Sequence, residues 1–450
     1  MRHIKLTLFG IIALMSVLWI AAEPGVFQPN GFFALRSAAV QYTGVLAIAA
    51  MSVAMMLALR PRWPERWMGG LDKMYRLHKW LGVTVLVVAV IHWLWAKGPK
   101  WAGNWGLLER PARAPRAPIS DPTEAFFASL RGTAESVGEW AFYAAVVLIA
   151  LALIRVVPYR WFYKTHRLVA IAYLLLVFHT VILLNFADWL TPLGAAMTLL
   201  MAGGTFAAGV VLLRQVGAAR QVSGRIAELT YYPGVKALET IIDMSAGWPG
   251  HRAGQFAFAM SDASEGAHPY TIASDWHPDH PRITFITKEL GDHTNRLKER
   301  LKMGQEVRVE GPYGCFTFDD DCRHQIWIGG GIGITPFIAR MKHMAMRDGT
   351  PDWPPGQSIN LFHATGDVDE LALARLSEDA SSANVRLHLL VSARDGRLTG
   401  ARIRDAVADW REASLWFCGP ADFGAALRRD FAREGFPVQK RFHQELFDMR

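Results

Sequence analysis

The first half of the chain consists of long apolar runs joined by polar connections. A membrane-spanning helix needs about 17–25 mostly apolar residues. Five of the runs reach that length, and the fourth reaches it if it extends through Val157. The runs without Asp, Glu, Lys or Arg are Leu6–Ala22, Ser37–Leu59, Trp80–Ala96, Trp140–Ile154, Leu168–Phe186 and Trp189–Leu213. This pattern predicts a six-helix transmembrane bundle.

After Leu213 the pattern changes to short runs separated by Gly and Pro. Alternating stretches such as Arg225–Thr230 and Arg282–Thr287 are typical of β-strands. From about residue 325, strand-like and helix-like runs alternate, which is typical of a parallel α/β sheet. The chain is therefore predicted to be multidomain, with the transmembrane bundle over residues 1–219, an antiparallel β-barrel over 220–318 and an α/β nucleotide-binding domain over 319–450.

Composition and charge narrow the class of protein. The chain has 450 residues, of which 51% are hydrophobic and 20% charged, so it is neither disordered nor a single domain. Three cysteines are too few for a disulfide scaffold or for an ordinary four-thiolate iron–sulfur cluster. Residues 1–219 carry 20 Lys and Arg against 9 Asp and Glu, whereas residues 220–450 carry 28 against 31. The basic excess lies in the apolar half, so it does not indicate nucleic-acid binding.

The same charges predict the orientation in the membrane. Lys and Arg cluster at the N-terminus, in the 60–79 loop and in the 155–167 loop, which share one side if six helices alternate. Because cytoplasmic loops carry the basic excess, both termini and the second half are predicted to be cytoplasmic, in the inner (plasma) membrane. The long 97–139 segment carries both signs of charge and is assigned to the outside, as a cap or as a linker. The first run could instead be a cleaved signal peptide, which would leave the second half on the same side.

Four histidines, His78, His92, His166 and His179, lie in or at the edge of the apolar runs. Helical rises of about 21 Å between the first two and about 19.5 Å between the last two place His78 level with His166, and His92 level with His179. Two imidazoles at each level suit two b-type haems, although a pair of other metal sites is the alternative. A step of 13 residues turns a helix by about 140° from the starting face. The fifth helix is therefore expected to twist or bulge, or the two haems to approach it from different sides.

Two groups of residues in the second half resemble the flavin-binding segments of the ferredoxin-NADP reductase superfamily. The stretch His268-Pro-Tyr-Thr-Ile-Ala-Ser274 has the His-Pro form of ferric reductases and NADPH oxidases, and read alone it could also be an edge strand. The resemblance implies that Tyr270 lies against the FAD ring and that Thr271, near its reactive nitrogen, is a catalytic residue. The FAD-binding residues that it implies are His268, Pro269, Tyr270, Thr271, Ser274, Lys288 and Thr294. In that family a turn like that of Gly311, Pro312 and Gly314 lies near the flavin or the nicotinamide phosphates.

The stretch from Gln325 to Pro336 is the most specific in the chain. An apolar strand leads into Gly329, Gly330, Gly331 and Gly333, and Thr335 and Pro336 then open a helix, so that a pyrophosphate can reach backbone amides. In the resembled superfamily this stretch binds NADPH, with Cys418, Gly419 and Pro420 beside the nicotinamide and Cys418 a catalytic residue. Ser392 with Arg394 or Arg397 follows a strand where that family binds the adenosine 2′-phosphate, which favours NADPH over NADH.

The C-terminal Phe447 resembles the aromatic residue that covers the flavin in NADPH oxidases and would be a catalytic gate, although residues 448–450 follow it here. From about residue 38 onward the chain resembles a bacterial transmembrane flavocytochrome b of the ferric reductase and NADPH oxidase superfamily. The resemblance implies electron transfer from cytoplasmic NAD(P)H through FAD and two haems b to an external acceptor, which would be oxygen, a ferric chelate or a redox protein. The alternatives are an electron donor to a membrane quinone or periplasmic redox protein, and a membrane receptor that uses its nucleotide domain without turnover.

Overall fold

A computed structural model of the protein describes residues 2–27, 31–108, 119–154, 159–262, 265–291, 293–345 and 357–445. The chain divides into two units, one formed by residues 1–68 and 73–216 and the other by residues 217–449 together with 69–72. Within the described residues, six helical segments are long and apolar enough to cross a membrane. The predicted fold class is confirmed, because the first unit holds these helices and the second holds an antiparallel and a parallel sheet.

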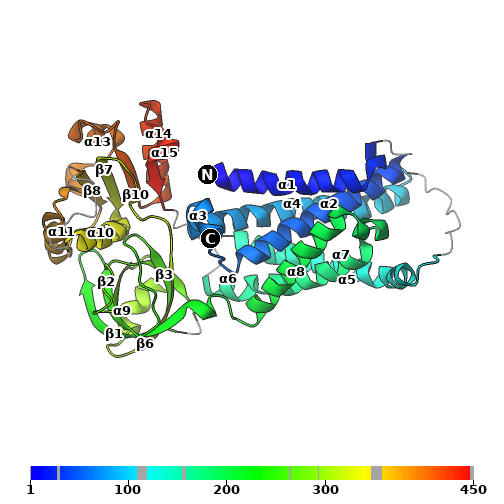
Figure 1. The fold of residues 1–450 in the computed structure, drawn as a ribbon, viewed down its shortest axis with the longest axis horizontal. Coiled ribbons are helices and arrows are strands. Elements are labelled where there is room, and N and C mark those ends of the chain that lie inside the picture. The colour runs from blue at the N-terminus through cyan, green and yellow to red at the C-terminus, as the bar shows by residue number, and fades with distance from the viewer. Residues whose placement is uncertain are drawn as a thin grey trace. The chain divides into compact units, whose positions relative to one another are not determined.

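The long helices of the first unit extend past several of the apolar runs (Figure 1). They are α1 (Arg2–Ala22), α2 (Phe32–Leu57), α4 (Leu71–Asn104), α5 (Pro122–Leu153), α7 (Val169–Leu183) and α8 (Pro192–Leu212), with shorter turns at η1 (Pro24–Phe27), α3 (Glu65–Met68) and η2 (Phe186–Leu190). The prediction of one long outer loop over 97–139 is wrong for much of its length. Lys97 on α4 and Glu139 on α5 pair at 2.6 Å, and Asp121 caps α5 by accepting bonds from the amides of Thr123 and Glu124.

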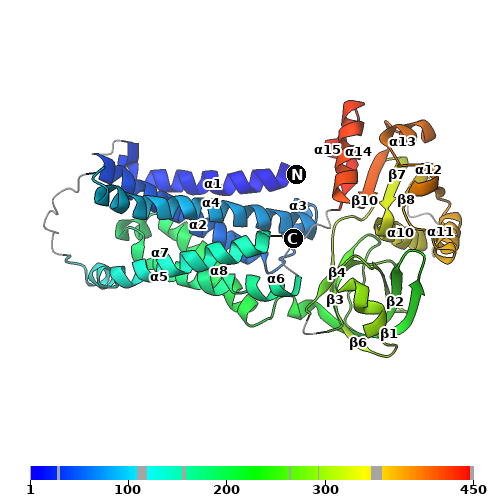
Figure 2. The ribbon, with the colours of Figure 1, turned by 180° about the vertical axis from the view of Figure 1, so that it is seen from behind.

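Helix α5 lies along α7, and α2 lies along α8, in both views of the bundle (Figure 2). Small residues allow the close approach that helix pairs in lipid require. Gly204 on α8 leaves room for the fully buried ring of Tyr173 on α7. The Tyr173 hydroxyl lies 2.9 Å from the Ser52 hydroxyl on α2 and donates to the Met201 carbonyl at 3.3 Å. One side chain therefore joins three helices of the bundle.

The fifth span is interrupted between its two histidines. Helix α6 (Tyr159–His166) ends at His166, and α7 begins at Val169 after a two-residue turn. Because of this turn, His166 and His179 do not lie on one continuous helix, and the direction of one side chain does not determine the direction of the other. The 13-residue spacing therefore does not force the two side chains onto different faces. The structure has this break where the sequence led us to expect a twist or a bulge.

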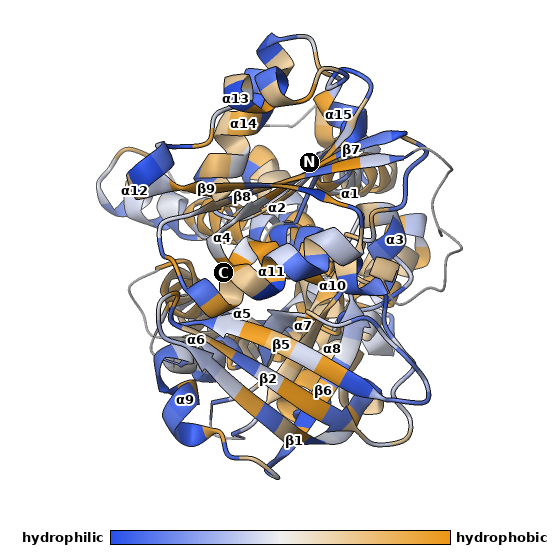
Figure 3. Ribbon diagram, turned by 90° about the vertical axis from the view of Figure 1, so that its left-hand side faces the viewer, coloured by the Kyte–Doolittle hydropathy of each residue, from blue (hydrophilic) through white to orange (hydrophobic). Residues whose placement is uncertain are grey.

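The second unit begins with an antiparallel sheet, in the order β4-β3-β6-β1-β2-β5 among the described strands. These are β1 (Gln221–Tyr232), β2 (Ala237–Met244), β3 (Phe256–Met260), β4 (His268–Thr271), β5 (Arg282–Lys288) and β6 (Glu306–Tyr313). Hydrophobic residues recur at intervals along β1, β2 and β6 (Figure 3) and form one core that includes Ile226, Ile242 and Val309. The edge strands approach at the bridge between Ile272 and Phe285, so the sheet curls toward a barrel.

The second sheet of this unit is parallel throughout, in the order β11-β10-β7-β8-β9 among the described strands. Its strands are β7 (His324–Gly330), β8 (Ser358–Thr365), β9 (Arg386–Val391), β10 (Ser414–Cys418) and β11 (Phe442–Gln444), and its helices include α10 (Thr335–Ala345), α11 (Glu370–Ser382), α12 (Ser392–Asp395), α13 (Gly400–Ala406), α14 (Ala421–Arg433) and α15 (Val438–Arg441). Side chains alternate between the two faces of a strand. Trp327 and Trp416 accordingly belong to one core cluster, and Ile326 and Leu415 to another.

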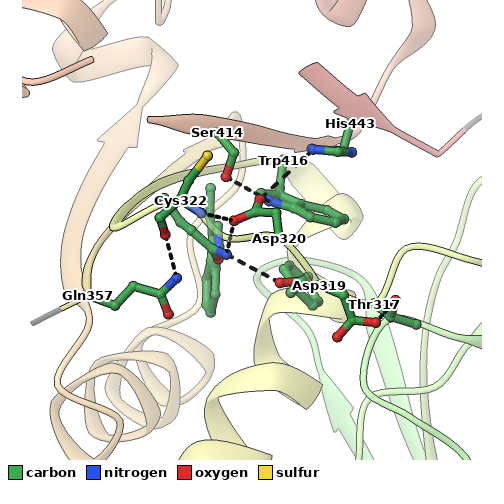
Figure 4. A network of polar contacts seen from close by, with 11 residues as sticks. Thr317, Asp319, Asp320, Cys322, Gln357, Ser414, Trp416 and His443 are labelled. Atoms are coloured by element: carbon green, nitrogen blue, oxygen red, sulfur yellow. Dashed lines mark hydrogen bonds and ion pairs between the residues drawn. The ribbon is translucent and has the colours of Figure 1, made fainter. Parts of the chain in front are cut away.

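Asp320 ties the segment before β7 to strand β10 (Figure 4). Its carboxylate accepts hydrogen bonds from the Trp416 indole at 3.0 Å, the Gln325 side chain at 3.1 Å and the Cys322 amide at 3.0 Å. Trp416 and Gln325 are each about 3% exposed, so water cannot readily replace Asp320 as their acceptor.

Replacing Asp320 with Ala is expected to lower the free energy of unfolding of this unit by about 1–3 kcal/mol, because buried donors lose an acceptor. The midpoint of thermal unfolding of the full chain, followed by tryptophan fluorescence, measures the effect. Asp319→Ala is the matched control, since the contacts of Asp319 with Arg252 and Thr317 are exposed and contribute little. Equal midpoints for the two variants would contradict the assignment.

Candidate functional site

The four histidines of the apolar runs form two facing pairs in the first unit. The ring centroids of His78 and His166, here named the inner pair, are 5.9 Å apart. Those of His92 and His179, the outer pair, are 6.4 Å apart. Two imidazole nitrogens at about 2 Å on either side of one metal ion would separate the ring centroids by about 6 Å. Both pairs therefore have the spacing of two ligands that share one ion.

Hydrogen bonds fix the tautomer of three of these rings. The Nδ1 atoms of His78, His92 and His179 lie 2.9, 3.0 and 2.8 Å from the backbone carbonyl oxygens of Ala54, Val40 and Ala134. Because a carbonyl oxygen can only accept, each Nδ1 carries the hydrogen and each Nε2 keeps its lone pair. This is the arrangement of metal-binding histidines. The His166 ring stacks on Phe162 at 5.1 Å, and its Nδ1 has no hydrogen-bond partner among the described residues.

A cavity of about 560 Å³ adjoins the outer pair, and its walls come from α2, α4, α5 and α7. Gly138 on α5 admits the His179 ring, since a Cβ atom there would overlap it. The lining combines apolar side chains with the charged residues Arg36, Lys97, Lys100, Arg131, Glu135 and Glu139. Paired imidazoles, an apolar cavity and nearby cations suit a haem, whose iron needs axial nitrogens and whose carboxylates need positive partners.

The antiparallel sheet brings two of the predicted flavin segments together. Thr271 on β4 pairs with Phe256 on β3, and Phe256 pairs with Tyr313 on β6. Strand β3 therefore lies between the segment of His268, Pro269, Tyr270 and Thr271 and strand β6. Gly311 and Pro312 lie on β6, which ends at Tyr313 just before Gly314, where the sequence led us to expect a turn. The His268 ring stacks on the His293 ring at 3.7 Å, and burial lowers the pKa of His268 to about 4. His268 is thus neutral near pH 7.

Three other predicted flavin residues hold the local fold together. The Lys288 ammonium pairs with Asp367, which follows β8, at 2.5 Å. The Thr294 hydroxyl oxygen accepts bonds from the amides of Leu290 and Gly291. Thr294 is the first residue of the short turn η4 (Thr294–Arg296), and one helical turn, α9 (Leu297–Arg300), follows it. The Ser274 hydroxyl accepts from the Thr284 amide at 3.1 Å. These contacts hold in place the chain around Ser274, Lys288 and Thr294, three of the residues predicted to bind the flavin.

The glycine-rich turn lies at the carboxyl end of β7, where the parallel sheet meets α10. Gly331 has a φ of +55°, a conformation that glycine adopts without strain, and opens the turn η5 (Gly331–Ile334). Gly333 lies against the backbone of Cys418 and Gly419, so a Cβ atom there would collide with that strand end. Thr335 and Pro336 begin α10, and Gly330 faces Pro420. The structure therefore places Cys418, Gly419 and Pro420 directly against the turn of Gly329, Gly330, Gly331 and Gly333.

Glu445 is a candidate residue that the sequence analysis missed. Its carboxylate is 2% exposed and lies near both Cys418 and Gly314. Gly314, expected near the flavin or the nicotinamide phosphates, and Cys418, expected beside the nicotinamide, thus both lie near one acidic side chain. Burial, together with the Glu445 charge, raises the pKa of the Cys418 thiol, which stays protonated near pH 7. The sequence signal that could have identified Glu445 is an acidic residue inside the aromatic C-terminal stretch. Phe447, the predicted cover of the flavin, lies outside the described residues.

The predicted 2′-phosphate residues follow β9. Ser392 and Arg394 lie on α12, and the Arg394 guanidinium forms two 3.0 Å bonds to the carboxylate of Asp395. Asp395 also accepts from the Val391 amide at 2.8 Å, and the Arg397 carbonyl oxygen accepts from Arg402. Arg394 is therefore held by an acidic neighbour, with which a 2′-phosphate would have to compete.

His363 on β8 supports the glycine turn from the adjacent strand. Its Nδ1–H donates to the Gly329 carbonyl oxygen at 3.2 Å, and burial lowers its pKa to about 4. An unfolded histidine has a pKa near 6.5, so between about pH 4 and 6.5 the unfolded chain binds more protons than the folded chain. Stability is therefore lost as the pH falls through 6.5.

Protonation of this single group in the unfolded chain is expected to lower the free energy of unfolding by about 1–2 kcal/mol at pH 5.5 relative to pH 8. His363→Asn should show a shallower loss of thermal stability between pH 7 and 5 than the unsubstituted chain. Thermal midpoints at several pH values provide the measurement, with the exposed His280→Asn as control. Parallel pH profiles for His363→Asn and the unsubstituted chain would contradict the expectation.

Parts of the chain are similar to several known proteins. Residues 43–177 match the family model described as "Ferric reductase like transmembrane component". The chain is 31% identical over 166 residues to a flavohemoprotein of Bordetella pertussis (34% of this chain, 39% of that protein) and 30% identical over 169 residues to an NADPH oxidoreductase of Mycobacterium tuberculosis (37% and 43%). Among solved structures it is similar to the Amycolatopsis cytochrome P450 reductase GcoB, with a TM-score of 0.43, 21% identity and coverage of 51% and 70%.

The chain spans about two-fifths of the length of these two curated relatives. The family match confirms, for residues 43–177, the ferric reductase-like transmembrane region that the sequence predicted. The transmembrane match and the six apolar helices identify a multi-pass membrane protein.

Proposed function

We propose that the protein is an NAD(P)H-dependent transmembrane oxidoreductase that delivers electrons to an acceptor on the far side of the membrane. Residues 1–219 would carry two b-type haems, residues 220–318 FAD, and residues 319–450 the nicotinamide nucleotide. The observation that carries the proposal is the presence of two facing histidine pairs in the apolar helices, with Nδ1 of three rings bonded to backbone carbonyls. The relatives named above support the oxidoreductase class.

In the second unit, the chain would position two cofactors against each other. The turn from Gly329 to Gly333 would present backbone amides to the nucleotide pyrophosphate, and the Tyr270 and Thr271 strand would hold the flavin ring. Cys418 and Glu445 would exclude water where the two meet, with the thiol neutral. FAD, when bound, supplies the conversion of a hydride donor into a donor of single electrons. We propose NADPH as the donor with NADH less favoured, and Phe447 as the cover of the flavin ring.

In the first unit, the chain would hold each haem iron between two neutral imidazoles. The backbone carbonyls of Ala54, Val40 and Ala134 orient three of them. Haem, when bound, supplies reversible one-electron transfer. The surrounding residues would keep the haems apart from water, so that electrons pass on without reaction inside the protein. Cations at the outer cavity would pair with haem carboxylates.

The membrane topology belongs to the same proposal. The basic loops favour a cytoplasmic second unit in the inner membrane, with the inner pair near the cytoplasm and the outer pair near the outside. NAD(P)H is cytoplasmic, so this orientation supplies the donor on one side and releases electrons on the other. The acceptor would be oxygen, a ferric chelate or a redox protein.

Anaerobic addition of NADPH to membranes that contain the full chain tests the function. We expect a two-haem absorption spectrum that becomes reduced, and reoxidation by oxygen or by a membrane-impermeant ferric chelate added to the outer side. Nucleotide binding without reduction of any haem would contradict the proposal and would favour the receptor class. Reoxidation only by quinone would contradict the external acceptor.

A further inference from the structure

His92 differs from the other candidate ligands in the partners of its Nδ1 atom. Besides the Val40 carbonyl oxygen at 3.0 Å, this nitrogen lies 3.1 Å from the hydroxyl oxygen of Thr43. The bonds of His78 and His179 at Nδ1 go to backbone carbonyls. Thr43 is 8% exposed and reaches His92 on α4 from the neighbouring helix α2. A buried side-chain hydroxyl thus touches one ligand of the outer pair.

The direction of this hydrogen bond follows from the other contacts of Thr43. Its hydroxyl hydrogen is directed to the Ala39 carbonyl oxygen at 2.6 Å, one turn earlier on the same helix. The oxygen therefore offers a lone pair to His92. Because Val40 can only accept, the Nδ1–H of His92 is shared between two acceptors. Gly44, the next residue along α2, has no side chain and lets the His92 ring lie close to the helix. A Cβ atom at position 44 would be 3.3 Å from Cε1 of His92.

We infer that Thr43 is a positioning residue that sets the reduction potential of the outer haem. The inference rests on the proposed function, since it requires a haem at the outer pair. A second acceptor on Nδ1–H fixes the ring and makes Nε2 a stronger donor to iron. A stronger donor stabilises the ferric state more than the ferrous state, which lowers the potential. Thr43 would therefore bias the outer site toward releasing its electron.

The test is a spectroelectrochemical titration of the purified full chain in four forms: unsubstituted, Thr43→Val, Thr43→Ser and Thr180→Val. Valine keeps the shape of threonine and removes the hydroxyl, whereas serine restores it. Thr180→Val is the matched control, since Thr180 lines the same cavity but its hydroxyl donates to the Leu176 carbonyl at 2.9 Å. Two haems in the unsubstituted chain must be found first, because their absence would refute the proposed function itself.

In Thr43→Val we expect the ferrous-to-ferric ratio of one haem at a fixed potential to rise three- to tenfold, where tenfold corresponds to 59 mV for one electron. The other haem should keep its potential, and Thr43→Ser and Thr180→Val should match the unsubstituted chain. Loss of one haem in Thr43→Val alone, with retention in Thr43→Ser, would also support the positioning role. Unchanged potentials in Thr43→Val, or an equal shift in Thr180→Val, would overturn the inference.

Discussion

A His92→Leu variant is expected to contain one haem per chain in place of two and to deliver electrons to an external acceptor at least tenfold more slowly. Leucine is close to histidine in size and cannot ligate iron, so His179 would be left as the single imidazole at the outer level. The second unit is a separate body of the chain with its own cores. Reduction of FAD by NADPH should therefore proceed at the unsubstituted rate.

Haem extraction, flavin content and stopped-flow reduction of FAD measure these three quantities in one preparation. His78→Leu is the informative companion, because it breaks the inner pair and leaves the outer pair intact. The two variants should each retain one haem with different spectra. Two haems in His92→Leu, or an unchanged rate to the external acceptor, would show that the outer pair is not a haem site on the electron path.

The membrane helices were predictable because lipid leaves few solutions for a long apolar run. Their ends were not. Lys97 and Glu139 read as loop residues, but they lie within α4 and α5 and pair with each other. An irregularity in the fifth helix was expected only as a twist or a bulge, and the break at residues 167–168 was not predicted as such. The prediction assumed one continuous helix from His166 to His179. On such a helix a step of 13 residues places the two side chains on different faces, a restriction that the break removes.

In the second unit, the glycine-rich and flavin segments were visible because each is a short stretch of consecutive residues. Contacts between distant residues were not visible. Lys288 is paired with Asp367, and Glu445 lies near Gly314 and Cys418, at separations of tens to more than a hundred residues. Such contacts depend on strand order and register, which single-strand patterns do not specify. The contact between Thr43 and His92 was not visible in the sequence either, because it forms between two different helices, α2 and α4.

A Gly138→Ala variant is expected to weaken haem binding at the outer pair without replacing either of the two histidines. Gly138 lies one turn beyond Ala134 on α5, and Ala134 is the residue whose carbonyl oxygen holds the His179 Nδ1 atom. An added methyl group at position 138 would occupy the place of the His179 ring. Overpacking of this kind costs about 1–3 kcal/mol, which corresponds to a roughly 5- to 150-fold loss of affinity at the outer level. Haem titration of the apoprotein, followed by absorbance, measures that loss.

The matched control is Gly209→Ala on α8, where a Cβ atom would meet nothing within 4 Å. Alanine favours a helix over glycine by about 1 kcal/mol, so this control should be at least as stable as the unsubstituted chain and bind both haems. The inner pair should keep its spectrum in both variants, since neither substitution contacts His78 or His166. If Gly138→Ala bound two haems as tightly as Gly209→Ala, the His179 ring would have to lie elsewhere in the loaded protein. The outer pair could then not have the geometry described here.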